Sequence, residues 1–157
     1  IVPVRIQFGE KGYLDKVSIT SEDFFIKLKE NPIYPTTSQP SIGDFRRQFQ
    51  YLANHFPDVI SINISNKVSG TFDAAKLATK KITASGQVHI FNSLNASLAQ
   101  GQITVIAARC AKAGKTVKET LEILEIARSN TKTYAPKYIA LEIAKHCLSP
   151  PDIVPTA

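Results

Sequence analysis

The stretch that decides the fold is residues 59–75, which read VISINISNKVSGTFDAA. Alternating β-branched residues over 59–64 predict a buried strand, and apolar residues at helical spacing from Thr71 onward predict a helix. Ser69 and Thr71 then place hydroxyl groups and free backbone N–H groups at the positive end of that helix. Gly70 has no Cβ, so the backbone there can pass close to a ligand. The arrangement suits an anion, although Ser and Thr are also the commonest helix N-cap residues.

Two other hydroxyl-rich loops lead into helix-forming runs. Residues 34–41, YPTTSQPS, carry two prolines that hold the backbone extended, and Ser41 is the expected N-cap of a helix. Residues 92–97, NSLNAS, follow a short apolar strand over 88–91 and precede an apolar helix over 98–110. Each loop fits two interpretations, an ordinary helix cap or part of a binding site.

The remaining sequence predicts a hairpin and two further helices from alternation and capping residues. The expected elements are a strand over 1–8, a turn over 9–12, a returning arm over 13–19, a capped helix from Thr20 to Asn31 and a capped helix from Thr116 to Ala127. Strand, loop and helix in repeated order imply right-handed crossovers and an α/β fold, a parallel sheet with helices on both faces. Ligands bind at the carboxyl ends of such strands, so the three loops are expected to converge on one edge.

Length and composition exclude several classes of protein. The chain has 157 residues, 43% hydrophobic and 20% charged, which is typical of one globular domain with a sizeable core. No run approaches the roughly 20 apolar residues that a membrane helix needs, and the first residues do not resemble a signal peptide. A cytoplasmic location is therefore expected. The net charge of +6 is spread without a dense basic run, so we expect no nucleic acid partner.

The residues that hold metals are scattered. Cys110 and Cys147 lack the paired spacing of a zinc site, and His55, His89 and His146 form no pair at i, i+4 with a carboxylate. We expect no metal and no cofactor.

Three segments resemble the DegV family, bacterial proteins that bind fatty acids. They are residues 35–41 (PTTSQPS), residues 64–71 (ISNKVSGT) and, more loosely, residues 92–101 (NSLNASLAQG). Their order and spacing also fit, and the similarity covers residues 1–131. It implies an N-terminal, lipid head-group-binding α/β domain over 1–133 and a second domain that closes over it.

The resemblance also implies a site and a role. Thr37 or Ser38, together with Ser69, would hold the carboxylate of a long-chain fatty acid, with Gly70 and Thr71 giving backbone room and support. Candidate supporting residues are Ser65, Asn92, Ser93 and Ser97. The protein would be a carrier without catalytic residues that presents the acyl chain to a separate fatty acid kinase, which makes acyl phosphate for phospholipid synthesis. Transient contact with a membrane surface is a further expectation.

The sequence also departs from the family. The opening Asp-Ser segment is absent, Asn92 stands where the family has Asp, and Ala99 replaces a Gly. After Thr131 the family continues with a basic motif that supplies an arginine near the head group, whereas residues 134–157 look like a fragment of the second α/β domain. We expect a break or omission near 133–136. Because the chain starts at Ile1 and contains no Met, we also expect a longer natural polypeptide.

The chemistry of these hydroxyl-rich loops suits a fatty acid. Each buried methylene contributes about 0.8 kcal/mol, so the tail supplies affinity. The carboxylate must find donors for the hydration it loses, and neutral hydroxyls with helix amides can provide them. Two alternatives are a Ser-dependent hydrolase and a phosphate- or nucleotide-binding α/β domain. Ser69 is not in G-x-S-x-G, and neither G-x-x-x-x-G-K-[ST] nor G-x-G-x-x-G occurs.

Overall fold

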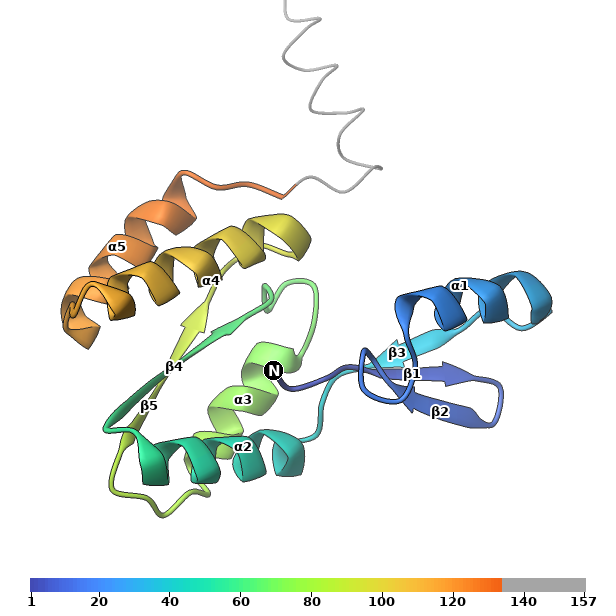
Figure 1. Cartoon of the computed structure of the whole chain (residues 1–157), viewed down its shortest axis with the longest axis horizontal. Helices are drawn as coiled ribbons and strands as arrows, with labels where there is room; N and C mark the ends of the chain where they lie inside the picture. The colour runs from blue at the N-terminus through green and yellow to red at the C-terminus, as the bar shows by residue number, and fades with distance from the viewer. Residues whose placement is uncertain (134–157) are drawn as a thin grey trace, which may run out of the picture.

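The computed structural model of the chain describes residues 1–133 and contains five strands and five helices in that range (Figure 1). In chain order they are β1 Arg5–Phe8, β2 Lys11–Leu14, α1 Ser21–Glu30, β3 Thr36–Ser38, α2 Ile42–His55, β4 Asp58–Asn63, α3 Thr71–Thr79, β5 Gln87–Asn92, α4 Ser97–Lys112 and α5 Val117–Ser129. The expected second-domain fragment over 134–157 and the expected break near 133–136 lie outside the described residues, apart from Thr133.

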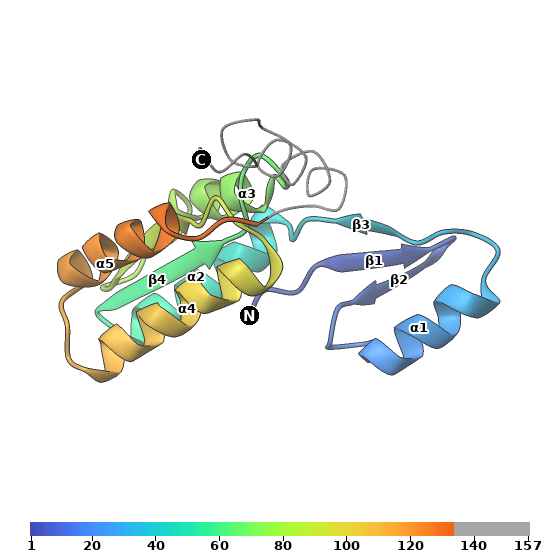
Figure 2. The same cartoon turned by 90° about the horizontal axis from the view of Figure 1, so that it is seen from above.

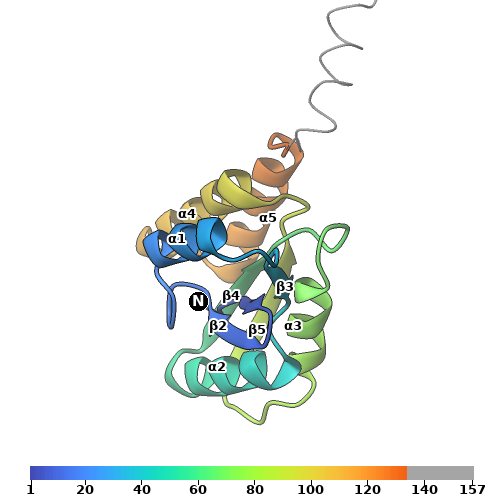
Figure 3. The same ribbon diagram turned by 90° about the vertical axis from the view of Figure 1, so that its right-hand side faces the viewer.

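The main body is a three-layer α/β unit built on two parallel strands. β4 and β5 pair in register from Asp58 beside Gln87 to Asn63 beside Asn92. Helices α2 and α3 cover one face, and α4 and α5 cover the other, as Figures 1 and 3 show. The predicted α/β fold with a parallel sheet and helices on both faces is therefore confirmed.

Each face of the sheet has its own core. Phe45 and Phe49 of α2 pack on three alanines of α3, whose small side chains let the two helices approach closely. On the other face Ile103 and Leu124 are fully buried against Phe91 of β5. These two cores hold the carboxyl ends of β4 and β5, and the loops that follow them, in fixed positions.

A second, smaller unit differs from the sequence expectation. β1 lies between β2 and β3 in an antiparallel sheet that also carries α1, and this sheet lies beside the parallel one (Figure 2). The strand expected over 1–8 forms only at Arg5–Phe8, and its returning arm is Lys11–Leu14. The hairpin is tighter than expected because Gly9 adopts a φ of 56°, which a two-residue turn with Gly first requires.

Part of the hydroxyl-rich loop over 34–41 is a strand. Thr36–Ser38 forms β3, with Thr37 opposite Ile6 of β1. The extended backbone expected there is confirmed, and the ladder with β1 gives its physical reason. Consequently only two of the three loops follow strands of the parallel sheet.

Contacts of β1 and of the residues before it connect the small unit to the main body. Arg5 Nη2 of β1 lies 2.9 Å from Asp44 Oδ2 of α2, and Val2 packs against the core between α2 and α3. Within residues 1–133, every helix is too short or too polar to cross a lipid bilayer.

Candidate functional site

A cavity of about 1040 Å³ lies where β3, β4 and the starts of α2, α3 and α4 meet. The five residues expected to contact or support a carboxylate all line it: Thr37, Ser38, Ser69, Gly70 and Thr71. Thr37 and Ser38 come from β3 of the small unit, and the other three come from the β4–α3 connection. The structure therefore brings together two loops that lie about thirty residues apart in the sequence.

The Ser69 loop ends in an open helix N-terminus. Gly70 is the N-cap of α3 and makes no side-chain cap hydrogen bond. Ser69 Oγ lies 2.8 Å from Thr71 Oγ1 and accepts from the Thr71 backbone N–H at 3.3 Å. Ala74 donates the first backbone bond of the helix, to Gly70, so the amides before it have no partner inside the helix. One hydroxyl donates to the other and the Thr71 N–H is bonded to Ser69, so the remaining neutral donors are one hydroxyl and the next amides of α3.

Gln39 explains the glycine at position 70. A Cβ at Gly70 would overlap the Gln39 side-chain oxygen and lie 3.1 Å from its Nε2. The sequence attributed Gly70 to the close passage of a ligand, whereas the structure places a protein side chain there. Gln39 also lines the cavity, so it joins the two loops through direct contact.

The N-terminus of α2 is closed by its own side chains. Ser41 Oγ accepts from the Asp44 backbone N–H at 3.1 Å, and Asp44 Oδ2 accepts from the Ser41 N–H at 3.1 Å and its hydroxyl at 2.7 Å. The Ser41 hydrogen bond and the Arg5 guanidinium lower the pKa of Asp44 from 3.8 to about 2. The capping box thus satisfies the Ser41 and Asp44 amides and places a carboxylate at this helix end, where it would repel a second carboxylate. The starts of α3 and α4 lack a side-chain cap, and of these two only the start of α3 carries a predicted carboxylate donor that lines the cavity.

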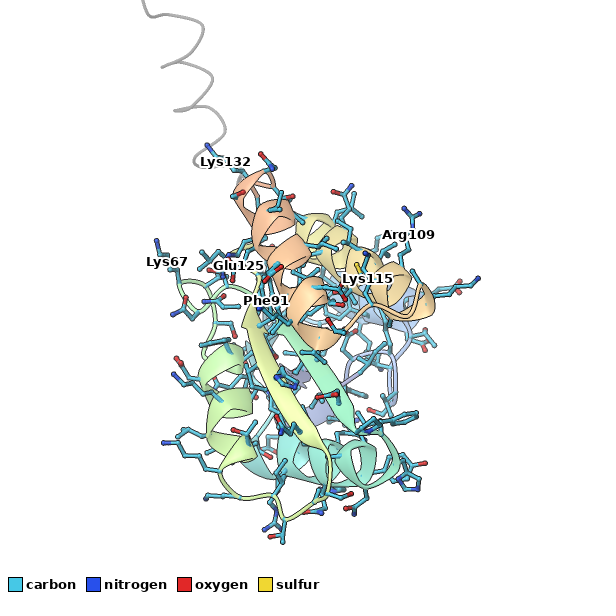
Figure 4. The ribbon with its side chains drawn as sticks, turned by 90° about the vertical axis from the view of Figure 1, so that its left-hand side faces the viewer. Lys67, Phe91, Arg109, Lys115, Glu125 and Lys132 are labelled. Carbon is cyan, nitrogen blue, oxygen red and sulfur yellow. The ribbon has the colours of Figure 1, made fainter. Side chains whose placement is uncertain are left out.

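The cavity has a neutral lining with an apolar wall. None of its lining residues is Asp, Glu, Lys, Arg or His. Lys67, the one cation in residues 64–71, is exposed and projects outward from its loop (Figure 4). The apolar wall consists of Ile1, Val2, Val4, Pro40, Phe45, Phe49, Leu52, Val59, Ile60, Ile62, Ile64 and Val68. A ligand with a polar head and a long apolar tail matches this division.

The four candidate supporting residues do not line the cavity. Ser65 and Ser93 are buried and belong to the hydrogen-bonded contact between the β4–α3 and β5–α4 loops. Asn92 donates to Asn66 Oδ1 at 2.8 Å, and Ser97 is exposed at the start of α4. The expected convergence of three loops on one site is therefore corrected. The loops over 34–41 and 64–71 line the cavity, whereas the loop over 92–97 contacts the second of these loops and does not line the cavity. Pairing of β4 with β5 brings the third loop there.

Sequence reasoning missed several polar residues of the lining. They are Gln39, Gln48, Ser61, Asn63, Gln100 and Thr104. Gln100 donates to the Ile62 carbonyl at 3.3 Å and lies one helical turn before Thr104. Their i, i+4 spacing, which places both on one side of the helix, was the available signal for these two.

Histidines and metal ligands lie elsewhere. His89 Nε2 lies 2.8 Å from Asp58 Oδ1, at the amino ends of β5 and β4, whereas Ser69 follows the carboxyl end of β4. Among residues 1–133, no three His, Cys, Asp or Glu side chains gather closely enough to hold a metal ion.

Comparison with known proteins points to one family. A family model described as an uncharacterised protein of the DegV family matches residues 1–136. A DegV domain-containing protein from Halalkalibacterium halodurans is 33% identical over 132 residues, which are 83% of this chain and 46% of that protein.

Solved structures agree with this result. One described as showing fatty acid binding of a DegV family protein from Thermus thermophilus has 33% identity and a TM-score of 0.73, over 82% of this chain and 45% of that one. DegV from Bacillus subtilis, described as a fatty acid binding protein, has 29% identity and a TM-score of 0.75 over the same shares. The chain spans slightly less than half the length of these relatives.

Proposed function

The chain belongs to the DegV family, and on that premise we propose that the protein binds a long-chain fatty acid with its carboxylate at the Ser69 loop. The observation that carries the proposal is the cavity itself, where neutral donors on two loops adjoin an apolar wall without a charged side chain. Relatives described as fatty-acid-binding proteins support it.

Neutral donors suit a ligand that must be handed on. A carboxylate that loses its hydration needs several donors, and each charge-assisted hydrogen bond contributes roughly 1.5 to 3 kcal/mol. Ser69, Thr71 and the first amides of α3 can supply these bonds from one side, and Thr37 or Ser38 from the other. The helix dipole adds a partial positive charge without a fixed ion pair. The head group is thereby oriented but remains exchangeable.

The tail supplies most of the affinity. At about 0.8 kcal/mol per buried methylene, a long acyl chain gains on the order of 10 kcal/mol before the entropy of ordering is subtracted. Phe45, Phe49 and Leu52 of α2 contribute to this wall, and so do Ile60 and Ile62 of β4. A fatty acid therefore uses both halves of the cavity, whereas a free phosphate has no group for the apolar wall.

We further propose that the protein is a carrier that works in the cytoplasm beside a fatty acid kinase. The bound acid would be phosphorylated by that separate enzyme to acyl phosphate for phospholipid synthesis, with transient contact at a membrane surface. A hydrolase is disfavoured because the His89–Asp58 pair lies at the opposite end of the strands from Ser69. His89 lies three residues before the carboxyl end of β5 and Asp58 lies five residues before that of β4, which is roughly 10 and 17 Å.

Calorimetric titration of the protein in its natural length tests the proposal. A fatty acid is expected to bind more tightly than a fatty alcohol of equal length, since only the acid carries the charge that the donors recognise. Acyl phosphate should form only when ATP and a fatty acid kinase are both added. Ester turnover that is lost in Ser69→Ala would favour the hydrolase instead.

A further inference from the structure

Asn92, the last residue of β5, is held in one orientation. Its Oδ1 accepts from the Leu94 backbone N–H at 3.1 Å, and its carbonyl accepts from Arg128 Nη1 at 3.0 Å. The Arg128 guanidinium in turn lies over the ring of Phe91, 5.2 Å from its centroid; Figure 4 shows Phe91 at the end of β5 beneath α5. Because Oδ1 is already bonded to Leu94, the amide presents its Nδ2 to Asn66, whose Oδ1 is 2.8 Å away.

Asn66 belongs to the compact turn that ends at Ser69. The backbone N–H groups of Val68 and Ser69 both donate to the Ser65 carbonyl, at 3.0 and 3.1 Å. The Ser69 hydroxyl then lies 2.8 Å from that of Thr71, at the cavity. A displacement of Asn66 is therefore transmitted through three residues to the proposed carboxylate donor.

We propose that Asn92 is a positioning residue for recognition of the carboxylate, and that it acts through Asn66 on the Ser69 hydroxyl. The inference rests on the proposed function, because it takes Ser69 as the contact with the ligand. Neither asparagine lines the cavity. An aspartate at position 92 would have no N–H to donate to Asn66 Oδ1, so the Asn66 amide would have to reverse. The direction of the bond, from Asn92 Nδ2 to Asn66 Oδ1, is therefore the one that an asparagine at this position allows.

A double-mutant cycle tests whether Asn92 acts through Ser69. The affinities for a fatty acid and for the matching alcohol are measured by titration of the protein in its natural length. The variants compared are Asn92→Leu, Ser69→Ala and the double variant. Asn92→Leu removes the bonds to Asn66 and to the Leu94 N–H; losing the Asn66 bond should weaken the acid about three- to tenfold and change the alcohol less than about twofold. The double variant should bind the acid like Ser69→Ala alone, because the effect of Asn92 has no other route.

Asn66→Ala is a second variant that tests the same contact if Asn92→Leu does not fold. Asn66 is exposed, so its truncation should leave the fold intact and still reproduce the selective loss of acid affinity. The matched control is Asn54→Ala, an exposed asparagine of α2 whose contact with Gln50 is long at 3.5 Å, and it should bind both ligands like the parent.

Three results would overturn the inference. They are equal weakening of acid and alcohol by Asn92→Leu, independent losses that multiply in the double variant, and a parent-like Asn66→Ala. If the parent binds no fatty acid, the proposed function fails as well. If the parent prefers the acid and Asn92→Leu keeps that preference, only the role of Asn92 is wrong.

Discussion

Ser69 and Thr37 carry the head-group proposal at the level of single residues. Each truncation to Ala is expected to remove one donor to the carboxylate and weaken fatty acid binding about ten- to hundredfold, from roughly 1.5 to 3 kcal/mol per bond. Calorimetric titration measures the affinity, and thermal denaturation measures stability. A residue that only supports the helix start would instead lose about 1 kcal/mol of stability and leave affinity nearly unchanged.

Gly70 gives a second prediction for a single residue. Its φ of −71° is allowed to any residue, so Gly70→Ala strains no backbone, but the new Cβ displaces the Gln39 amide. Because that amide is the far end of a flexible side chain, the free energy of unfolding should fall by only about 1 kcal/mol or less. In a Gln39→Ala background the same substitution should be neutral by urea denaturation. A loss as large as in the parent background would show that Gln39 is not the obstacle.

Some of the residues that line the cavity were predicted from local sequence order, and others were not. Ser69, Gly70 and Thr71 were identified because a strand, a polar loop and a helix are adjacent in the chain, and local order fixes their arrangement. Gln39 and Gln100 were missed because their positions depend on how β3 and α4 pack against β4. No local pattern encodes that packing.

At the level of elements, the contact between β1 and α2 predicts a dependence of stability on pH. The pKa of Asp44 is lowered to about 2, first by Ser41 and then by Arg5. The resulting stabilisation is complete above the ordinary pKa of 3.8 and is lost as the pH falls from about 4 towards 2. With the carboxyl side chain 23% exposed, we expect a loss of about 1 kcal/mol. Urea denaturation between pH 5 and 2 should show a flatter profile for Asp44→Asn, and an unchanged profile would contradict this role.

Helix α5 gives a prediction about the core. Leu124 is completely buried against Ile103 and Phe91, so Leu124→Ala should lower the free energy of unfolding by about 2 to 5 kcal/mol. Ile126 lies on the same helix and is 63% exposed. Ile126→Ala is therefore the matched control and should change stability by less than about 0.5 kcal/mol. Equal effects of the two substitutions would contradict the packing of α5 on the sheet.

Helices were predicted best where their first residues carried a capping signal. Ser41 and Thr116 each form a capping box, and the helices that they begin were expected from those residues. Strand β3 was not expected, because three residues between two prolines resemble a loop until β1 is placed beside them. Cross-strand pairing is decided by tertiary structure rather than by local preference.

At the level of the whole molecule, the order of strands and helices predicted the α/β class correctly. It did not predict that β1 and β3 form a separate antiparallel sheet. That sheet brings Thr37 and Ser38 to the cavity. The proposed head-group site therefore depends on two units held together by few contacts, among them the Arg5–Asp44 ion pair.

The most direct test of fatty acid binding is denaturing mass spectrometry of an organic extract of the purified protein in its natural length. We predict long-chain fatty acid in the extract of the parent, approaching one molecule per polypeptide, and clearly less in an extract of Ser69→Ala prepared in parallel. A parent extract without fatty acid, from a folded protein that also fails to bind added fatty acid, would contradict the account.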